Sequence, residues 1–167
     1  MIEAVHIADL AEPQFPPEIA EMFAAVEPLG EQVRLEPDAL CRQVSDELGL
    51  EDFGDEAFLE PLAVVTSALE GEAGLSGMGR VSSQAQIVQL LKNRLLVAQA
   101  LSAHPEIEDI EVVRPIFIAG QPRTGTTHLH NLISSDPALR SLPYWEAVEP
   151  LPAPGEPFAD PGPRVAR

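Results

Sequence analysis

Apolar residues recur at helical spacing through the first two thirds of the chain. Positions three and four apart share one face of a helix, so this recurrence predicts amphipathic helices. Proline or a capping residue stands near the starts of these segments, and glycine or proline stands near their ends. The predicted helices span residues 18–27, 37–48, 55–70 and 83–103.

The segment 83–103 carries the strongest helical pattern. Ser83 and Gln86 form a capping-box pattern, which predicts the start of the helix at Ser83. Its apolar residues cover one broad face: Ile87, Leu90, Leu91, Leu95, Val97 and Leu101. We expect this face to be largely buried against other elements.

One strand is predicted, at residues 115–119, where apolar residues follow one another without alternation. Such a run is typical of a parallel strand that is covered on both faces. A helix is predicted to follow at 126–135, and prolines crowd the chain from residue 150 onward. Because a lone strand has no hydrogen-bond partners, we expect the chain to be the N-terminal part of a longer α/β protein.

These patterns divide the chain into four regions. Residues 1–34 are predicted to form an irregular N-terminal arm with a short helix, and residues 35–106 a helical region. Residues 107–148 would begin an α/β domain, and residues 149–167 would form a proline-rich C-terminal tail. The predicted fold class is therefore a truncated α/β fold, mostly helical in the part present.

The charge of the chain narrows the classes of partner. Its 167 residues include 27 acidic and 10 basic side chains, for a formal net charge of −17. Such a surface repels polyanions, so nucleic-acid binding is not expected. Cys41 is the single cysteine, which excludes a disulfide within the chain and suits a reducing compartment.

No signal peptide or transmembrane segment is expected. The N-terminus lacks a basic start and an apolar run. The best candidate for a membrane span, residues 87–103, carries Lys92, Asn93 and Arg94 in its middle. We therefore expect a soluble, cytoplasmic protein.

The loop after the predicted strand carries the candidate chemistry. Gly120 and Gly125 have the spacing of a phosphate-binding loop, and Arg123 is the one cation between them. Thr126 and Thr127 stand where nucleotide hydrolases carry Lys and Ser/Thr. A strand that leads into a helix presents free backbone N–H groups and the positive end of the helix dipole.

The surroundings of this loop also favour an anion. No acidic residue occurs between positions 112 and 135, although the chain as a whole is strongly acidic, and Arg114 and Arg123 lie in this interval. The arginine guanidinium is a planar, permanently charged donor. The sequence therefore predicts an anion-binding loop, with a plain strand-to-helix turn as the alternative.

Residues 114–127, Arg-Pro-Ile-Phe-Ile-Ala-Gly-Gln-Pro-Arg-Thr-Gly-Thr-Thr, resemble the 5′-phosphosulfate-binding loop of sulfotransferases. These enzymes use 3′-phosphoadenosine 5′-phosphosulfate (PAPS) as sulfuryl donor. Residues 50–54, 93–95, 129–133 and 144–146 also resemble the bacterial branch of that family. The resemblance implies a P-loop-like α/β sulfotransferase fold, a small-molecule hydroxyl or amine acceptor, and no metal.

The resemblance also assigns roles within the loop. Arg123 matches the basic residue that contacts the 5′-phosphosulfate. The residues that wrap the phosphate through N–H and hydroxyl groups are matched by Thr124, Gly125, Thr126 and Thr127. The family's 3′-phosphate site and late glycine-rich segment have no counterpart, so the resemblance implies an N-terminal portion that is weakly active or inactive alone.

Sulfuryl transfer also needs a group that takes the proton of the acceptor. Some bacterial relatives carry a Glu shortly after the loop helix, which makes Glu146 the candidate catalytic residue; a solvated surface carboxylate is the alternative. His128 and His130 are two positions apart and point to different sides of a helix, so they cannot form a metal pair. Cys41 lies on an apolar helix stripe and is interpreted as a small core residue.

Two other functions stay open on the sequence. One is a kinase-like nucleotide-binding enzyme with a degenerate phosphate loop, although no Lys precedes Thr127. The other is a non-catalytic helical interaction module that retains the loop as a vestige. The leading interpretation is a PAPS-dependent sulfotransferase.

Overall fold

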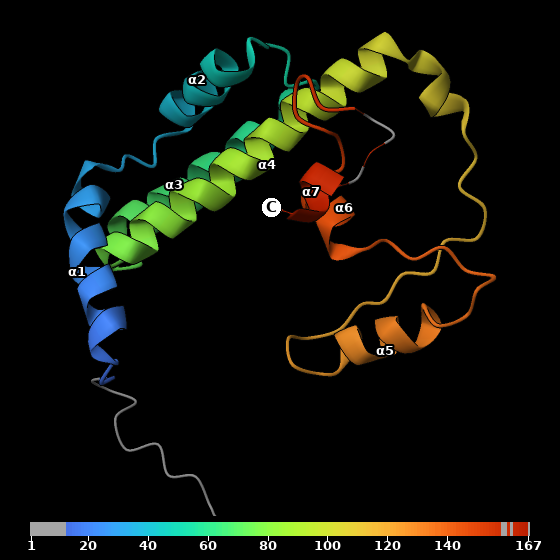
Figure 1. Cartoon of the computed structure of the whole chain (residues 1–167). Coiled ribbons are helices and arrows are strands. Elements are labelled where there is room, and N and C mark those ends of the chain that lie inside the picture. The colour runs from blue at the N-terminus through green and yellow to red at the C-terminus, as the bar shows by residue number, and fades with distance from the viewer. Residues whose placement is uncertain (1–12, 158–159, 161, 167) are drawn as a thin grey trace, which may run out of the picture. The chain divides into compact units, whose positions relative to one another are not determined.

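The computed structural model describes residues 13–157, 160 and 162–166 (Figure 1). The chain forms two compact units. The first consists of Met1–Glu47 and Asp55–Leu91, and the second of Leu48–Gly54 and Lys92–Arg167. Within the described part no helix combines the length and the hydropathy needed to cross a membrane.

Helices make up the regular structure of the described residues. The first unit contains helix α1 (Pro17–Gln32), most of α2 (Pro37–Leu48), the short 3₁₀ helix η1 (Glu56–Phe58), α3 (Leu59–Gly71) and the first part of α4 (Gly77–Ala103). The second unit contains the end of α4, then η2 (Pro105–Asp109), α5 (Thr126–Ile133), α6 (Tyr144–Val148) and α7 (Gly162–Ala166). Helix α2 has the predicted bounds, whereas α1 is longer than the predicted segment 18–27.

Helix α4 begins earlier than the capping-box pattern predicted. Its first residue is Gly77, and Ser83 lies inside the helix. Two other groups cap the start: the Glu27 carboxylate accepts a hydrogen bond from the Gly77 N–H at 2.8 Å, and Ser76 Oγ accepts one from the Gly79 N–H at 3.2 Å. Because these groups satisfy the N–H donors at a start six residues earlier, Ser83 is not needed as a cap.

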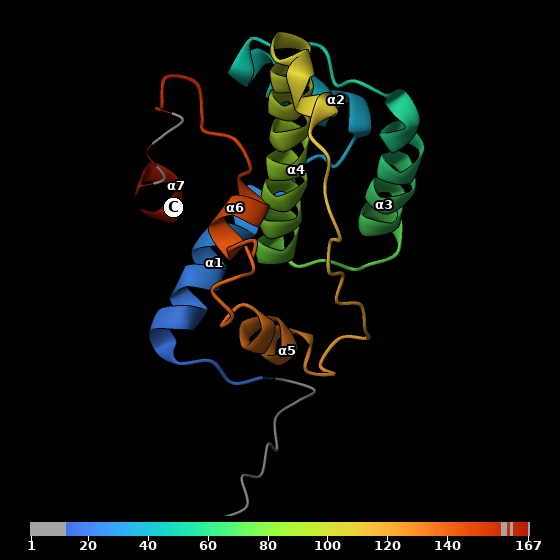
Figure 2. The same cartoon turned by 90° about the vertical axis from the view of Figure 1, so that its right-hand side faces the viewer.

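The strand predicted at 115–119 is absent, and no strand occurs among the described residues. The segment between η2 and α5 is mostly extended, and it forms no strand pair with the described part of the chain (Figure 2). Its apolar side chains are exposed accordingly, at 60% for Ile116 and 86% for Phe117. A strand exists only through hydrogen bonds to a neighbour, and the described chain supplies no neighbouring strand.

The core of the first unit forms around the chain that leaves α1. Leu35, Leu40 and Val44 are each at most 1% exposed, and Val88 and Leu91 of α4 are buried as well. The broad apolar face predicted for α4 is only partly confirmed, because Leu90 is 68% exposed. Helices α3 and α4 run in opposite directions on either side of a short connection (Figures 1 and 2).

Arg80 of α4 holds three segments of the first unit together. Its guanidinium donates to both carboxylate oxygens of Glu70 on α3, at 2.7 and 2.8 Å. It also donates to the carbonyl oxygens of Gly30 and Val33, at 3.1 and 2.9 Å, at the end of α1. The same Glu70 carboxylate accepts the Leu35 N–H at 2.8 Å. This ion pair therefore satisfies the last carbonyls of α1 and fixes the path into α2.

Two glycines allow α1 and α4 to meet backbone to backbone. A Cβ atom on Gly30 would lie 2.2 Å from Gly77 Cα, and one on Gly77 would lie 2.6 Å from Glu27 Cα. No side chain fits at such distances, so only glycine permits this crossing. The close approach also places the Glu27 carboxylate at the start of α4.

In the second unit, side chains tie the C-terminal helices to their neighbours. Asn93 Nδ2 of α4 donates to the Val148 carbonyl at 2.6 Å. Arg164 of α7 is 8% exposed, donates to the carbonyls of Glu149 and Pro150 at 3.2 Å, and lies 4.9 Å from the Trp145 ring centroid. The cation–π contact and the two hydrogen bonds hold α7 against α6.

We predict that Gly30→Ala destabilises the first unit by about 1–3 kcal/mol, because the added methyl meets the backbone of Gly77. Gly71→Ala is the matched control, since its Cβ would meet nothing within 4 Å. Urea unfolding, monitored by the circular dichroism signal of the helices, measures the free energy of unfolding of both variants. Equal stability of the two variants would contradict the close crossing.

A second prediction concerns pH. The hydrogen bonds from Arg80 and then from the Leu35 N–H hold the pKa of Glu70 below its ordinary value of 4.5. A carboxyl with a lowered native pKa stabilises the fold fully above its unfolded pKa and loses this contribution as the pH falls through the native value. Glu70→Gln should therefore lower the melting temperature at pH 7, and the deficit should vanish as the pH falls below 4.5.

The control for this experiment is Glu60→Gln, an exposed carboxylate on the same helix. Thermal unfolding at a series of pH values should show no comparable pH-dependent deficit for this variant. A Glu70→Gln deficit that is the same at pH 7 and at acid pH would contradict the role given to the ion pair.

Candidate functional site

The loop at residues 120–127 turns by means of left-handed backbone. Arg123 has φ 66° and Gly125, the N-cap residue of α5, has φ 94°. Thr124 Oγ1 donates a hydrogen bond to the Gln121 carbonyl at 2.6 Å and closes the turn. A Cβ on Gly120 would lie 3.0 Å from Thr124 Oγ1, so the two ends of the loop are close. An arginine in the left-handed region is strained, and such strain is frequent at binding sites.

Helix α5 begins with its backbone donors free of a side-chain cap. Gly125 carries no side chain that could accept them, and the first helical hydrogen bond is donated by the Leu129 N–H to the Gly125 carbonyl at 3.0 Å. The N–H groups of Thr126, Thr127 and His128 therefore point out of the helix start. An anion at this place would receive these donors and the positive end of the helix dipole.

The charged residues around the 120–127 loop favour a bound anion. Arg123 is exposed, and no acidic residue occurs from position 112 to position 135. In the described residues no group of His, Cys, Asp and Glu side chains has the arrangement of a metal site. The donor set, with backbone N–H groups, hydroxyls and a guanidinium, suits a bound anion.

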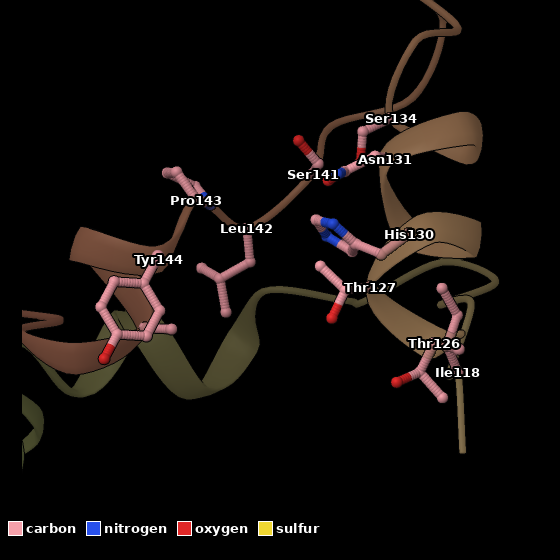
Figure 3. Close-up of a pocket in the computed structure, with 11 residues that line it drawn as sticks. Ile118, Thr126, Thr127, His130, Asn131, Ser134, Ser141, Leu142, Pro143 and Tyr144 are labelled. Atoms are coloured by element: carbon pink, nitrogen blue, oxygen red, sulfur yellow. The ribbon is translucent and has the colours of Figure 1, made fainter. Parts of the chain in front are cut away.

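A cleft of about 600 Å³ adjoins this helix start. Two segments of the second unit form most of it, helix α5 and the stretch that enters α6 (Figure 3). The lining residues are Ile118, Thr126, Thr127, His130, Asn131, Ser134, Ser141, Leu142, Pro143, Tyr144 and Ala147. Figure 3 shows Thr127 and His130 pointing from α5 toward Leu142.

The structure brings only some of the predicted site residues to the cleft. Thr126 and Thr127 line it, whereas Arg123, Thr124 and Gly125 form the turn before it. Glu146 is not among the lining residues, although its neighbour Ala147 is. The Glu146 carboxylate is instead paired with the Arg140 guanidinium.

The two histidines of α5 differ as their spacing predicted. His130 is half-buried and lines the cleft, while His128 is exposed and does not. Sequence reasoning gave His130 no specific role. Ser141 and Leu142 were missed altogether, because no local pattern reveals that the segment before α6 folds back onto α5.

Cys41 lies far in sequence from this site, on α2. Partial burial raises the pKa of its thiol, and the nearby Asp38 carboxylate raises it further. A thiol with a raised pKa is a poor nucleophile at neutral pH, which agrees with a packing role.

Comparison with known proteins identifies relatives of this chain. The family model described as "Sulfotransferase family" matches residues 115–165. Among solved structures, the chain is similar to the sulfotransferase STF1 from Mycobacterium tuberculosis H37Rv, with 39% sequence identity and a TM-score of 0.63. The match covers 70% of this chain and 33% of the mycobacterial chain, so this chain spans about a third of that length. No curated protein matches the chain significantly.

These similarities bear on the three functions that the sequence left open. They support the sulfotransferase interpretation and do not favour a kinase-like enzyme or a helical interaction module. The matched region begins at residue 115 and therefore contains the whole 120–127 loop and helix α5.

We predict that Gly125→Ala loosens the start of α5, because a side chain at φ 94° costs about 1–2 kcal/mol. Amide hydrogen exchange at Leu129, which donates to Gly125, should speed up about 5- to 30-fold. Gly155→Ala is the control, with φ 88° and no neighbour within 4 Å of the added Cβ. Exchange at Leu129 that is equally fast in both variants would contradict the role of Gly125.

Proposed function

Since this chain belongs to the sulfotransferase family, we propose that its 120–127 loop binds the 5′-phosphosulfate of PAPS, and that the enzyme transfers a sulfuryl group to a small-molecule hydroxyl or amine. Membership of the sulfotransferase family supports sulfuryl transfer as the class of reaction. The identity of the donor and its place in the loop are our proposal. A cytoplasmic location is also part of the proposal, in keeping with the single cysteine.

One observation carries the proposal: the turn at Arg123 and Gly125 delivers the chain into a helix whose first N–H groups have no side-chain cap. The feature lies inside the region that matches the family. Phosphate and sulfate groups bind such helix starts through backbone N–H groups and the helix dipole.

The loop residues would divide the work of holding the donor. The Arg123 guanidinium would pair with charged oxygens of the phosphosulfate. The N–H groups of Gly125, Thr126 and Thr127, with the two threonine hydroxyls, would bind further oxygens. Bound PAPS supplies an activated sulfuryl group, and donors fixed in place before the reaction stabilise the charge that shifts during transfer.

Glu146 stays our candidate for the group that takes the acceptor proton. Its carboxylate is about one quarter exposed and is paired with Arg140, which is itself largely exposed. To act as a general base, Glu146 would have to leave this exposed partner and turn toward the cleft. Exposed ion pairs contribute little to stability, so such a change costs little.

We predict that Arg123→Ala weakens PAPS binding to the 167-residue chain by about 1.5–3 kcal/mol, the usual contribution of hydrogen bonds to a charged group. The PAPS affinity of Arg123→Lys should lie between those of the parent and Arg123→Ala, because lysine keeps the charge but lacks the planar guanidinium. Arg42→Ala, at an exposed arginine of α2, is the matched control and should bind as the parent does. Isothermal titration calorimetry measures the PAPS affinity of the parent and the three variants.

Three results would count against the proposal. One is equal affinity of the parent and Arg123→Ala for PAPS. Another is displacement of PAPS by equimolar ATP, which would favour a nucleoside triphosphate as the ligand. Absence of PAPS binding by the parent at millimolar concentration would also refute it.

A further inference from the structure

The segment that leads from η2 to the 120–127 loop leaves its backbone groups unused. From Glu111 to Ala119, no N–H or carbonyl group has a hydrogen bond to another described residue. Arg114, with φ 49°, interrupts this segment, so residues 115–119 are its last uninterrupted run before the loop. A row of free N–H and carbonyl groups on an extended chain is a template for a second strand.

The same segment exposes apolar side chains one after another. Val112 is 74% exposed and Val113 is 64% exposed. Ile116 is 60% exposed and Phe117 is 86% exposed. Single exposed apolar residues are ordinary, but a run of them marks an interaction surface. The segment therefore offers both backbone groups and apolar side chains to a partner strand.

The two edges of this run are not equal. In an extended chain, alternate residues present their N–H and carbonyl groups to opposite edges. Ile116 and Ile118 share one edge, whereas Pro115 and Phe117 share the other. Pro115 has no N–H, so its edge lacks a donor, and a proline in a strand is found where that side faces solvent. The edge of Ile116 and Ile118 is therefore the one that suits a partner.

The two faces of the run differ as well. Ile116 and Ile118 line the hollow beside α5, and Phe117 does not. Neighbouring side chains of an extended chain point to opposite faces, so Phe117 points away from that hollow. Its ring is the most exposed large apolar side chain of the described residues. It is therefore free to pack against an aromatic ring of a partner strand.

The charges beside the run favour a second copy of the same chain. Four acidic residues precede it: Glu106, Glu108, Asp109 and Glu111. No acidic residue follows it before position 136, and Arg123 lies on that side. An antiparallel second copy would bring the acidic flank of each chain toward Arg123 of the other, whereas a parallel copy would bring like charges together. The net charge of −17 repels copies at long range, so this local attraction selects the antiparallel direction.

We propose that residues 115–119 of two copies pair as antiparallel strands about a two-fold axis at Phe117, so that the chain forms a homodimer. Ile116 of one copy lies opposite Ile118 of the other, and each such pair exchanges two backbone hydrogen bonds. The Phe117 rings meet in the closer, non-hydrogen-bonded position, and Pro115 lies where no N–H is required. The same residues serve both copies, as a two-fold interface requires.

Sedimentation velocity of the 167-residue chain without PAPS, from micromolar to millimolar concentration, tests the association. We expect a weak dimer, since one short strand from each copy makes a small interface. Phe117→Lys should raise the dissociation constant about tenfold or more, because an apolar contact is lost and two like charges meet at the axis. Val64→Lys, at an exposed valine of α3, makes the same change of charge and should leave the dimer intact.

The contribution of charge has its own pair of variants. Glu111→Lys should weaken the dimer, because it removes the acid that lies toward Arg123 of the other copy. Glu60→Lys, at an exposed position of α3, is the control with the same net charge. The circular dichroism of the helices should be unchanged in all four variants, since each replaces an exposed side chain.

Amide hydrogen exchange tests which edge pairs. As the concentration rises, the N–H groups of Ile116 and Ile118 should exchange more slowly, and that of Phe117 should not change. A chain that stays monomeric at millimolar concentration would overturn the proposal, and so would a dimer that Phe117→Lys leaves intact. Protection of Phe117 in place of Ile116 and Ile118 would also contradict it. These measurements contain no PAPS, so their failure leaves the proposed donor site standing, and failure of PAPS binding leaves the dimer standing.

Discussion

Left-handed backbone at Arg123 and Gly125 forms the turn that leads from the segment after η2 into helix α5. The turn has two consequences. It leaves the first N–H groups of α5 uncapped, and it sets the direction of the helix along which Thr127 and His130 face the cleft. The proposed donor site therefore depends on one short turn, and the Thr124–Gln121 hydrogen bond holds the strained backbone at Arg123.

Different interactions stabilise the first unit. Arg80 neutralises Glu70 and caps the end of α1, and the Gly30–Gly77 contact lets α1 and α4 approach to backbone distance. Here packing and hydrogen bonding reinforce each other, because the contact places carbonyl groups of α1 within reach of Arg80. None of these residues belongs to the proposed phosphosulfate site; they stabilise the fold of the first unit.

What the sequence predicted well was local. Helix α2 has the predicted bounds because Pro37 and Gly49 mark its ends, and the loop follows from its two glycines. What it predicted poorly depends on distant groups. The start of α4 is set by Glu27, fifty positions away, and the segment 115–119 cannot be a strand without a partner. The cleft was missed because residues 141–147 meet α5 only in three dimensions.

We propose that the helix start after Gly125 binds the phosphosulfate group. Titration of PAPS into the ¹⁵N-labelled chain, followed by amide NMR spectra, tests it most directly. We expect the amides of Gly125, Thr126 and Thr127 to shift first and furthest, since they would donate to the bound anion. Shifts confined to other parts of the chain, with these three amides unchanged at saturation, would contradict it.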